Sequence, residues 1–498
     1  MLTHVNQLAR HLVQLQTLSA KTNKAKKAVT IELLLLYDFG GEGKMALIHK
    51  FKQGDNYFVL DVNTGAVHIV DELVYDILED EKIKTMKEII EELKGKYSED
   101  DLVEAYEEIQ ELAEDGVIYS KDQYEEIAHS SMEDRDYIKA ICLNIIHGCN
   151  LRCKYCFADE GEYHGHKGVM TLDTAKKAID YVIKRSGPRK NIEIDLFGGE
   201  PTMIMDTIKE IVKYVRDNEA EWKKNIRFTM TTNATLLNDE MMDFMDKEMG
   251  NIILSLDGRK EVNDNVRIKV DGSGSYDDIL PNIKKMISKR TKGKTYFVRG
   301  TFTRQNTDFY EDVVSMLNEG FKEISIEPVV LEDGHPLSLR EEDLPKIFDN
   351  YDKLYNEMAI RKREKNGEFT FYHFNIDLQG GPCVYKRISG CGAGFEYVAI
   401  TPQGDVYPCH QFVGKEEYKL GSVYDDSFDS ELSKEFKMSH IYNKPKCKDC
   451  WARFYCSGGC QANNVNFNGD MKIPYEIGCK MQKKRIECAI ALKAEEVE

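Results

Sequence analysis

The feature that most limits the fold is an alternation of apolar strand-like segments and helical stretches between residues 137 and 335. Alternating strands and helices over roughly 200 residues favour a parallel barrel, so we expect an α/β fold built on a partial (β/α)6 TIM-like barrel. Active sites of such barrels lie at the carboxyl ends of the strands. The predicted strands are IKAICLNII, NIEIDLFGG, NIRFTMTTNA, NIILSLDG, YFVRGTFT and EISIEPVV.

The segments on either side of the barrel predict further domains. Three short strands and three amphipathic helices at 45–126 indicate a winged-helix-like domain, and its third strand would present a free edge to an extended peptide. A polar linker is expected near 127–136, a helical linker at 336–379 and a cysteine-rich domain at 380–490. Since Met45 opens a cleaner pattern than residues 1–44, we interpret those first residues as an extension or tag and expect them to be disordered.

Charge and composition exclude several classes of function. The chain of 498 residues has a formal net charge of −18, which argues against nucleic-acid binding because that role needs a basic surface. Between Asp71 and Glu126 there are 21 acidic residues against six lysines. This run is either a solvated helical surface or a surface that attracts a basic partner.

The apolar runs and the cysteines bear on the cellular setting. The longest apolar run near the start, IELLLLYDF, is too short to span a membrane and carries two acidic residues. Thirteen cysteines in 498 residues are too sparse for a disulfide scaffold. We therefore expect a cytoplasmic protein with neither a nucleic-acid nor a membrane partner, whose clustered cysteines bind metal.

Three cysteines follow the first predicted strand, at the rim where barrel chemistry takes place. Cys149, Cys153 and Cys156 are spaced C-x3-C-x2-C with no fourth cysteine nearby. A structural zinc site would need a fourth ligand, whereas three thiolates on a [4Fe–4S] cluster leave one iron open. Together with Tyr155, the triad resembles the signature of the radical S-adenosylmethionine (SAM) superfamily. The resemblance implies that the three cysteines are catalytic metal ligands and that the open iron binds SAM to generate a 5′-deoxyadenosyl radical.

The resemblance continues at the ends of other predicted strands. In GGEP the glycines would let the backbone approach SAM, and Glu200 would accept a hydrogen bond from its ammonium group, although an ordinary strand-to-helix turn is an alternative. Ser255 and Asp257 in SLDG resemble the ribose-binding pair of the family, and Arg267 resembles the partner of the SAM carboxylate. Asn233 in TTNAT is a polar strand-end residue for which a capping role is equally natural. The expected cofactor contacts are Tyr155, Gly198, Gly199, Glu200, Ser255, Asp257 and Arg267.

The cysteine-rich tail has a second spacing pattern. It runs C-x12-G-x4-C, a gap, C-x2-C-x5-C-x3-C, a further gap and a last cysteine, and it resembles the seven-cysteine motif of SPASM domains. A zinc ribbon is the alternative for the C-x2-C pair. The resemblance implies two auxiliary [4Fe–4S] clusters, so three clusters in all. The outer cluster would be held by Cys447, Cys450, Cys456 and Cys479, and the inner one by Cys391, Cys409 and Cys460 with Cys383 as a possible fourth ligand.

Three further cysteines need separate interpretation. If Cys383 is not a ligand, the inner cluster has an open iron that could bind a substrate thiolate. Cys142 and Cys488 lie outside both motifs and are interpreted as buried small hydrophobic residues.

Taken together, the three regions resemble the maturases of SCIFF peptides, which belong to the sactipeptide class and join a cysteine sulfur to an α-carbon in a thioether. The domain at 45–126 is similar to PqqD-like leader-recognition elements. The resemblance implies a ribosomally made, cysteine-rich precursor peptide that binds through its leader, and a low-potential electron donor such as a flavodoxin or ferredoxin.

Three other functions remain open. An anaerobic sulfatase-maturing enzyme, which forms formylglycine, shares barrel and tail, but that family has an aspartate directly after the cysteine matching Cys409, where this chain has His410. A peptide maturase that makes a carbon–carbon crosslink, epimerises or decarboxylates would use the same radical step. A non-enzymatic iron–sulfur scaffold or redox sensor would leave the SAM-type strand ends without a role.

Overall fold

The protein is described by a computed structural model in which residues 47–131, 137–163, 165–332, 334–376, 378 and 384–494 are placed. The predictions for residues 1–44 and for Cys383 therefore concern parts of the chain outside the described residues. None of the helices in these ranges is both long and apolar enough to cross a membrane.

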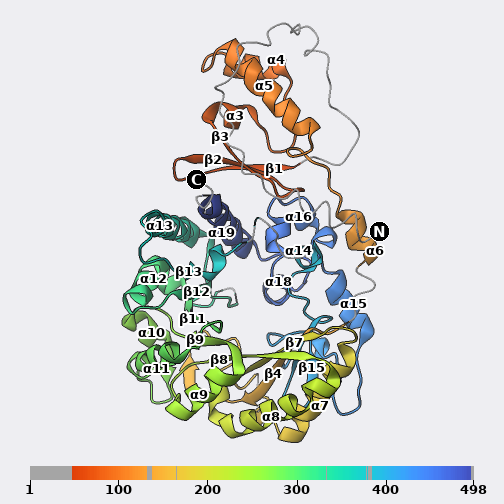
Figure 1. Cartoon of the computed structure of the whole chain (residues 1–498), viewed down its shortest axis with the longest axis vertical. Helices are drawn as coiled ribbons and strands as arrows, with labels where there is room; N and C mark the ends of the chain where they lie inside the picture. Colours follow the sequence, from red (N-terminus) through yellow and green to blue (C-terminus); the bar gives the residue numbers. More distant parts are fainter. Residues whose placement is uncertain are drawn as a thin grey trace.

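The predicted barrel is confirmed: six parallel strands pair in the order of the sequence and curve around a common interior (Figure 1). Helices cover the outer face of this sheet (Figure 1). The strands are β4 (Ala140–His147), β7 (Asn191–Gly198), β8 (Asn225–Thr232), β9 (Met249–Ser255), β11 (Thr295–Phe302) and β12 (Glu323–Pro328). The covering helices are α7 (Leu172–Arg185), α8 (Met205–Trp222), α9 (Asp239–Glu248), α10 (Lys260–Val266), α11 (Tyr276–Lys289), α12 (Phe309–Asn318) and α13 (Leu344–Arg363).

The alternation within each strand determines which side chains face the helices. In β7, Ile192, Ile194 and Leu196 are buried in the main core, whereas Asp195 and Phe197 lie on the opposite face. Full burial of one such aliphatic side chain stabilises the fold by about 1.5–3 kcal/mol. Because Asp195 and Phe197 point away from the helices, the polar positions of the strands line the barrel interior.

The cysteine-rich region continues the barrel sheet. β14 (Tyr397–Ile400) pairs in parallel with β4, and β15 (Asp405–Tyr407) and β16 (Gly421–Ser422) follow in antiparallel pairs. At the other end, β13 (Thr370–Phe371) pairs with β12. The region expected as a helical linker thus contributes α13 and β13 to the barrel layer. Shorter elements are β5 (Leu151–Cys153), β6 (Gly168–Val169), β10 (Arg267–Lys269), α14 (Val384–Ser389), α15 (Ser430–Met438), α16 (Pro445–Lys448), α17 (Arg453–Cys456) and α18 (Gln461–Asn468).

The N-terminal domain has the predicted three strands and three helices, with its own hydrophobic core. Each helix begins at a capping side chain, for example Thr85, which forms a capping box with Glu88. Among the described strands β3 pairs with β2 alone, so its other edge is open as expected. An unexpected helix, α6 (Glu125–Ser131), lies in the predicted polar linker. The elements are β1 (Ile48–Gln53), β2 (Asn56–Asp61), β3 (Val67–Val70), α3 (Glu72–Ile77), α4 (Met86–Leu93) and α5 (Glu99–Glu114).

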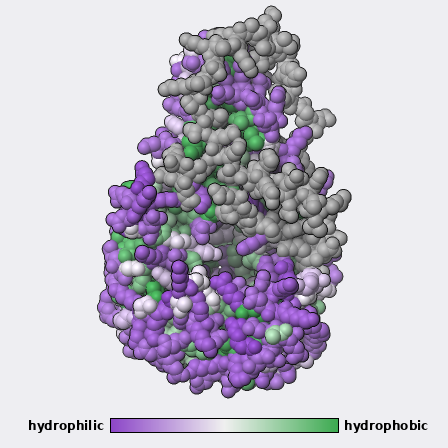
Figure 2. All heavy atoms as spheres, viewed as in Figure 1, coloured by the Kyte–Doolittle hydropathy of each residue, from purple (hydrophilic) through white to green (hydrophobic). Residues whose placement is uncertain are grey.

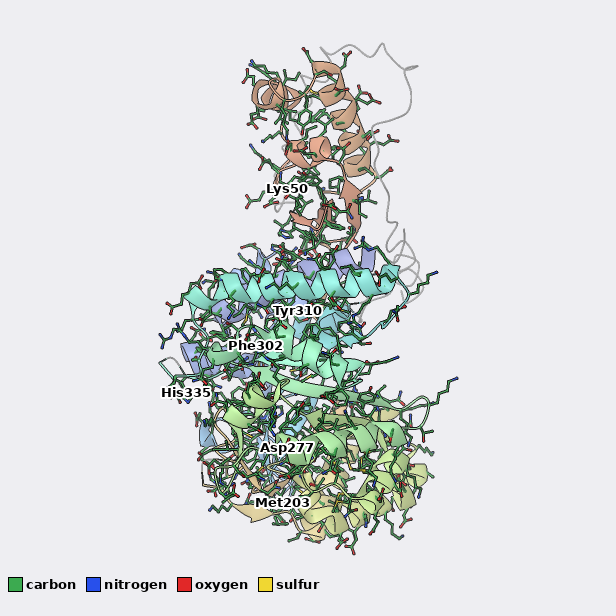
Figure 3. All side chains as sticks on the ribbon, turned by 90° about the vertical axis from the view of Figure 1, so that its left-hand side faces the viewer. Lys50, Met203, Asp277, Phe302, Tyr310 and His335 are labelled. Atoms are coloured by element: carbon green, nitrogen blue, oxygen red, sulfur yellow. The ribbon has the colours of Figure 1, made fainter. Side chains whose placement is uncertain are left out.

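This domain sits on α13 and on α19 (Glu476–Ala494), the last helix of the described chain (Figure 3). The Gln53 side chain connects all three parts, because its amide donates to Asp352 on α13 at 2.8 Å and its carbonyl accepts from Lys484 on α19 at 2.9 Å. Most of the described side chains on the face shown in Figure 2 are hydrophilic.

Candidate functional site

The cysteine triad lies in a loop directly after β4. Within it, β5 pairs in antiparallel fashion with β10, which places Cys153 opposite Arg267. The Cys156 amide donates to the Cys153 carbonyl at 3.1 Å, and Arg152 donates to the Cys149 carbonyl at 2.7 Å. The loop is therefore held by backbone contacts, and its thiols remain free of disulfides.

The glycines of GGEP lie against this loop. The Gly199 amide donates to the Ile146 carbonyl at 2.8 Å, and the Glu200 amide donates to the Gly148 carbonyl at 3.1 Å. A Cβ atom on Gly199 would lie 2.1 Å from the Gly148 oxygen, which no side chain tolerates. Gly198, with φ of +141°, is equally restricted to glycine. The second strand end and the cysteine loop thus form one closely packed unit.

The thiols of the triad need a positive charge nearby to ionise to thiolates. Burial raises the pKa of the Cys149 thiol to about 11 and that of the Cys153 thiol to about 12, and the neighbouring thiols of the triad add to both effects. Thiolates are the form that binds metal, and iron binding supplies the charge that stabilises them. On these grounds, three half-buried thiols in one loop fit an iron–sulfur cluster.

The Glu200 carboxylate is already engaged by the protein. It is 1% exposed and accepts hydrogen bonds from the Thr202 amide (3.0 Å), the Thr202 hydroxyl (2.5 Å), the Thr232 hydroxyl (2.7 Å) and the Asn233 amide (2.7 Å). Burial raises its pKa. In the structure this carboxylate joins the end of β7 to the end of β8, and its contact with the SAM ammonium stays a prediction.

Three predicted contacts come together in one network. The Tyr155 hydroxyl donates to Asp257 Oδ2 at 2.6 Å, and Arg267 Nε lies 3.1 Å from Asp257 Oδ1. Oδ1 also accepts from the Thr301 amide at 2.9 Å. Both oxygens of Asp257 thus have protein partners, while Ser255, at the end of β9, is half-buried. Burial raises the pKa of Tyr155 well above its usual value, so its hydroxyl remains a donor.

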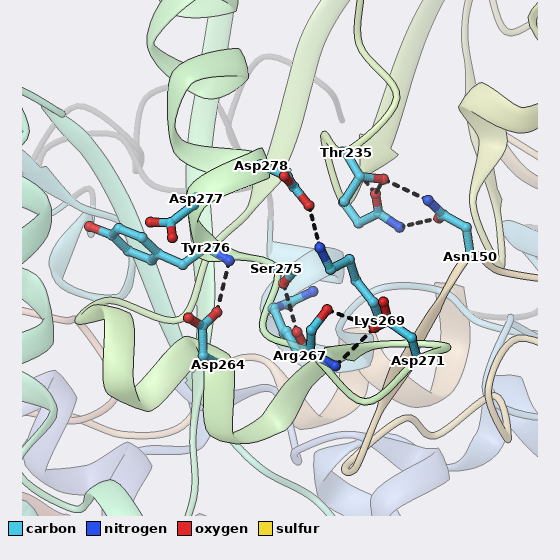
Figure 4. A network of polar contacts seen from close by, with 12 residues as sticks. Asn150, Thr235, Asp264, Arg267, Lys269, Asp271, Ser275, Tyr276, Asp277 and Asp278 are labelled. Carbon is cyan, nitrogen blue, oxygen red and sulfur yellow. Dashed lines mark hydrogen bonds and ion pairs between the residues drawn. The ribbon is translucent and has the colours of Figure 1, made fainter.

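Arg267 and Asn150 fix the loop from two sides (Figure 4). The Arg267 carbonyl accepts from the Ser275 hydroxyl at 2.6 Å. On the other side, the Asn150 amide donates to the Thr235 hydroxyl at 2.7 Å, and Asn233 Nδ2 donates to Asn150 Oδ1 at 2.9 Å and lies 3.7 Å from Cys149 Sγ. Sequence reasoning missed Asn150 and Thr235, although Asn150 directly follows Cys149 and Thr235 lies two residues after Asn233.

The barrel interior holds a cluster of polar side chains that sequence reasoning also missed. Arg299 on β11 has a side chain that is 46% exposed, and its guanidinium lies 3.6 Å from Glu327 on β12. Glu327 in turn lies 3.4 Å from the His373 ring, whose pKa is lowered by burial to about 3. Across the interior, burial raises the pKa of Asp195 to about 6. Single polar residues inside apolar strands were the available signal for this group.

The described thiols of the tail act on one another in two sets, and the assignment of each set to a cluster stays a prediction. Burial raises the pKa of Cys479 to about 12, and the next contributions come from the thiols of Cys456, Cys447 and Cys450. The second set is formed by Cys409, Cys460 and Cys391, which act on one another in the same way. Cys142 and Cys488 are buried, as predicted.

The spacing of these thiols bears on the zinc alternative. Within the described ranges, no three His, Cys, Asp or Glu side chains lie close enough together to hold a single metal ion. A zinc ion draws its thiolates to about 2.3 Å from one centre, whereas a cluster spreads them over several irons. Within the described ranges the structure therefore shows no preformed zinc site.

Comparisons with known proteins agree with this geometry. A model of the radical SAM superfamily matches residues 143–317, and a model of an iron–sulfur cluster-binding domain, SPASM, matches residues 391–451. The cysteine-type anaerobic sulfatase-maturating enzyme of Clostridium novyi is 28% identical over 340 residues, which cover 63% of this chain and 85% of that protein. The radical SAM cyclopropyl synthase TigE of Paramaledivibacter caminithermalis is 24% identical over 441 residues, which cover 83% of this chain and 88% of that protein.

A solved structure shows the same fold. Native anSMEcpe with bound AdoMet superposes with a TM-score of 0.60 at 19% identity, covering 72% of this chain and all of that one. The cysteine triad, the strand ends around it and the two family matches lead to one conclusion: this chain is an enzyme with a radical SAM domain at residues 143–317 and an iron–sulfur cluster-binding SPASM domain at residues 391–451.

Proposed function

We propose that the enzyme matures a ribosomally made, cysteine-rich precursor peptide by joining a cysteine sulfur to the α-carbon of another residue. The proposal rests on one observation, which is that the N-terminal domain contacts the loop of the outer cysteine set. Asp122 forms an ion pair with Arg453 at 3.2 Å, and the Tyr442 hydroxyl donates to Asp122 at 2.9 Å. A leader bound along the open edge of β3 would hold its peptide beside the domain that completes the reaction.

In this proposal, Cys149, Cys153 and Cys156 hold the cluster that binds SAM, and the two tail sets hold auxiliary clusters. Whether Cys383 is a ligand of the inner cluster is part of the proposal. When bound, these groups supply a 5′-deoxyadenosyl radical and an acceptor for the surplus electron. A flavodoxin or ferredoxin in the cytoplasm would supply the reducing electron.

The chain's own residues orient SAM and the peptide. Gly198 and Gly199 bring backbone carbonyl groups to the SAM methionine part, and Ser255 offers a hydroxyl at the end of β9. The Tyr155–Asp257–Arg267 network presents a guanidinium beside the cysteine loop, where it can pair with the SAM carboxylate. Polar side chains of the barrel interior, such as Arg299, contact the peptide segment and exclude bulk water from it.

One observation argues against the alternative of formylglycine formation by a sulfatase-maturing enzyme. His410 stands where that family has an aspartate, and it packs against Phe157 and Phe197 with ring centroids 5.3 and 5.0 Å away. Burial lowers its pKa to about 4, so it is neutral at pH 7 and cannot replace a carboxylate as an anion. Carbon–carbon bond formation is the second candidate, because the alignment with the cyclopropyl synthase covers 83% of this chain.

The test is anaerobic incubation of the reconstituted enzyme, SAM and reductant with a cysteine-rich peptide encoded beside the gene. We expect 5′-deoxyadenosine and a peptide lighter by two hydrogens, with one cysteine resistant to alkylation. A two-hydrogen loss with all cysteines still alkylated would support a carbon–carbon crosslink instead. An unchanged mass would count against crosslinking altogether.

A further inference from the structure

A lysine is buried between the two cysteine sets of the tail. Lys444 is 1% exposed and lies between a short 3-10 turn, Ile441–Asn443, and α16. Its Nζ donates to the Gly458 carbonyl at 2.8 Å. A Cβ atom on Gly458 would lie only 3.2 Å from this Nζ, so the loop that carries Cys456 and Cys460 is wrapped closely around the ammonium group.

Burial lowers the pKa of Lys444, and thiols from both cysteine sets oppose this effect by favouring the ammonium form. Cys447 and Cys456 belong to the outer set, and Cys460 and Cys391 belong to the inner set. Within the described residues no carboxylate lies within 4 Å of Lys444 Nζ. The other cation of this loop differs, because Arg453 has the carboxylate of Asp122 as its partner.

A buried ammonium group with one neutral acceptor is costly unless an anion compensates its charge. Four thiolates around an iron–sulfur cluster give the cluster a net negative charge, which increases when the cluster is reduced. A cation between two such clusters stabilises the reduced form of each, because nearby charge, hydrogen bonds and burial set their reduction potentials.

We propose that Lys444 is a positioning residue for electron transfer, whose ammonium group lies between the two auxiliary clusters and raises the reduction potential of both. This inference rests on the assignment of the seven tail cysteines made under the proposed function. It predicts that removing the charge affects the auxiliary clusters together and leaves the SAM-binding cluster in the barrel unaffected.

The test is a redox titration followed by electron paramagnetic resonance, on the full chain with Cys149, Cys153 and Cys156 replaced by alanine so that only the auxiliary clusters contribute. Lys444→Met removes the charge at similar length, and Lys444→Gln removes it but retains an amide donor. Lys446→Met is the matched control, because its side chain lies two residues away, is 68% exposed and pairs with Glu476.

We expect both charge-removing variants to shift both midpoint potentials to more negative values. The ratio of reduced to oxidised cluster at a fixed potential should fall at least about tenfold, which corresponds to about 59 mV for one electron. Lys446→Met should change this ratio less than twofold. In the chain that retains the barrel cysteines, the potential of the SAM-binding cluster should stay the same in all variants.

Unchanged auxiliary potentials in Lys444→Met and Lys444→Gln, with full iron and sulfide content, would overturn the inference and leave the proposed function intact. If neither Lys444→Met nor Lys444→Gln retains iron, Lys444→Arg is the deciding variant because it keeps the charge. Retention of both clusters in Lys444→Arg, with potentials near the wild type, supports the inference. Loss of iron from Lys444→Arg as well overturns the inference. A wild-type protein without auxiliary clusters would instead contradict the cysteine assignment itself.

Discussion

The imidazole ring of His49 stacks on the indole ring of Trp451, with 3.7 Å between the ring centroids and 3° between the planes. Trp451 directly follows Cys450 in the loop of the outer cysteine set, and His49 is on β1 of the N-terminal domain. His49 Nε2 also lies 3.0 Å from Glu487 on α19. The domain expected to read the leader therefore directly contacts the loop that carries Cys450.

Replacing His49 by alanine should uncouple peptide processing from SAM cleavage. An aromatic pair of this kind contributes about 0.5–1.5 kcal/mol, so the docking of the N-terminal domain should weaken by up to about tenfold. We expect 5′-deoxyadenosine formation without peptide to remain close to the wild-type rate, while modified peptide falls several-fold. Lys52→Ala, at an exposed position of the same strand, is the control. Equal peptide yields from both variants would contradict this role of the stacking contact.

Cys153→Ala should abolish SAM cleavage, because a cluster held by two thiolates in this loop lacks the ligand that β5 supplies. Loss of 5′-deoxyadenosine and of about one third of the bound iron should be measured together, since the three proposed clusters are alike in size. Cys488→Ala is the control, as this cysteine is buried and belongs to neither motif. Wild-type cleavage by the Cys153 variant would refute the assignment of the triad.

Gly199→Ala should disturb the barrel cluster without unfolding the protein. The added Cβ would lie 2.1 Å from the Gly148 oxygen, so the cysteine loop must move away from the end of β7. We expect reduced iron content and at least about tenfold slower SAM cleavage, with a destabilisation of about 1–3 kcal/mol. Gly95→Ala, where no atom lies within 4 Å of the added Cβ, should leave all three quantities unchanged.

Tyr155→Phe should weaken SAM binding. The variant removes the hydroxyl that donates to Asp257 at 2.6 Å, which leaves this buried carboxylate with fewer donors and releases Arg267 to pair with it more closely. A lost hydrogen bond to a charged group corresponds to about 1.5–3 kcal/mol, so the SAM dissociation constant should rise about ten- to a hundredfold. Anaerobic equilibrium binding measures this directly. Tyr181→Phe, which loses a bond to the Ser427 carbonyl outside the barrel, should bind SAM normally.

The parts of the fold that were predictable are those encoded by local patterns. The six barrel strands and the N-terminal helices follow from the spacing of apolar residues, and the division of the tail cysteines into two sets is expected from their spacing. The interior group around Arg299 was not predictable, because the sequence shows that Arg299 and Glu327 are polar but not that the barrel brings them together. The stacking of His49 on Trp451 joins distant segments whose pairing depends on how two finished domains dock. The hydrogen bonds that Glu200 accepts from Thr232 and Asn233 likewise depend on the register of β7 and β8, and no single segment of the sequence encodes that register.

The pairing of β14 with β4 has a consequence for the choice of substrate. Cys391 and Cys409 lie on either side of the β14–β15 hairpin, and the barrel triad follows β4, so one continuous ladder of backbone hydrogen bonds connects the two places. This ladder fixes the distance between the proposed SAM-binding cluster, where the radical would form, and the proposed inner auxiliary cluster, which would accept the electron. If the proposed function is correct, a peptide must place its reacting residues at this separation, and peptides that cannot do so are excluded as substrates.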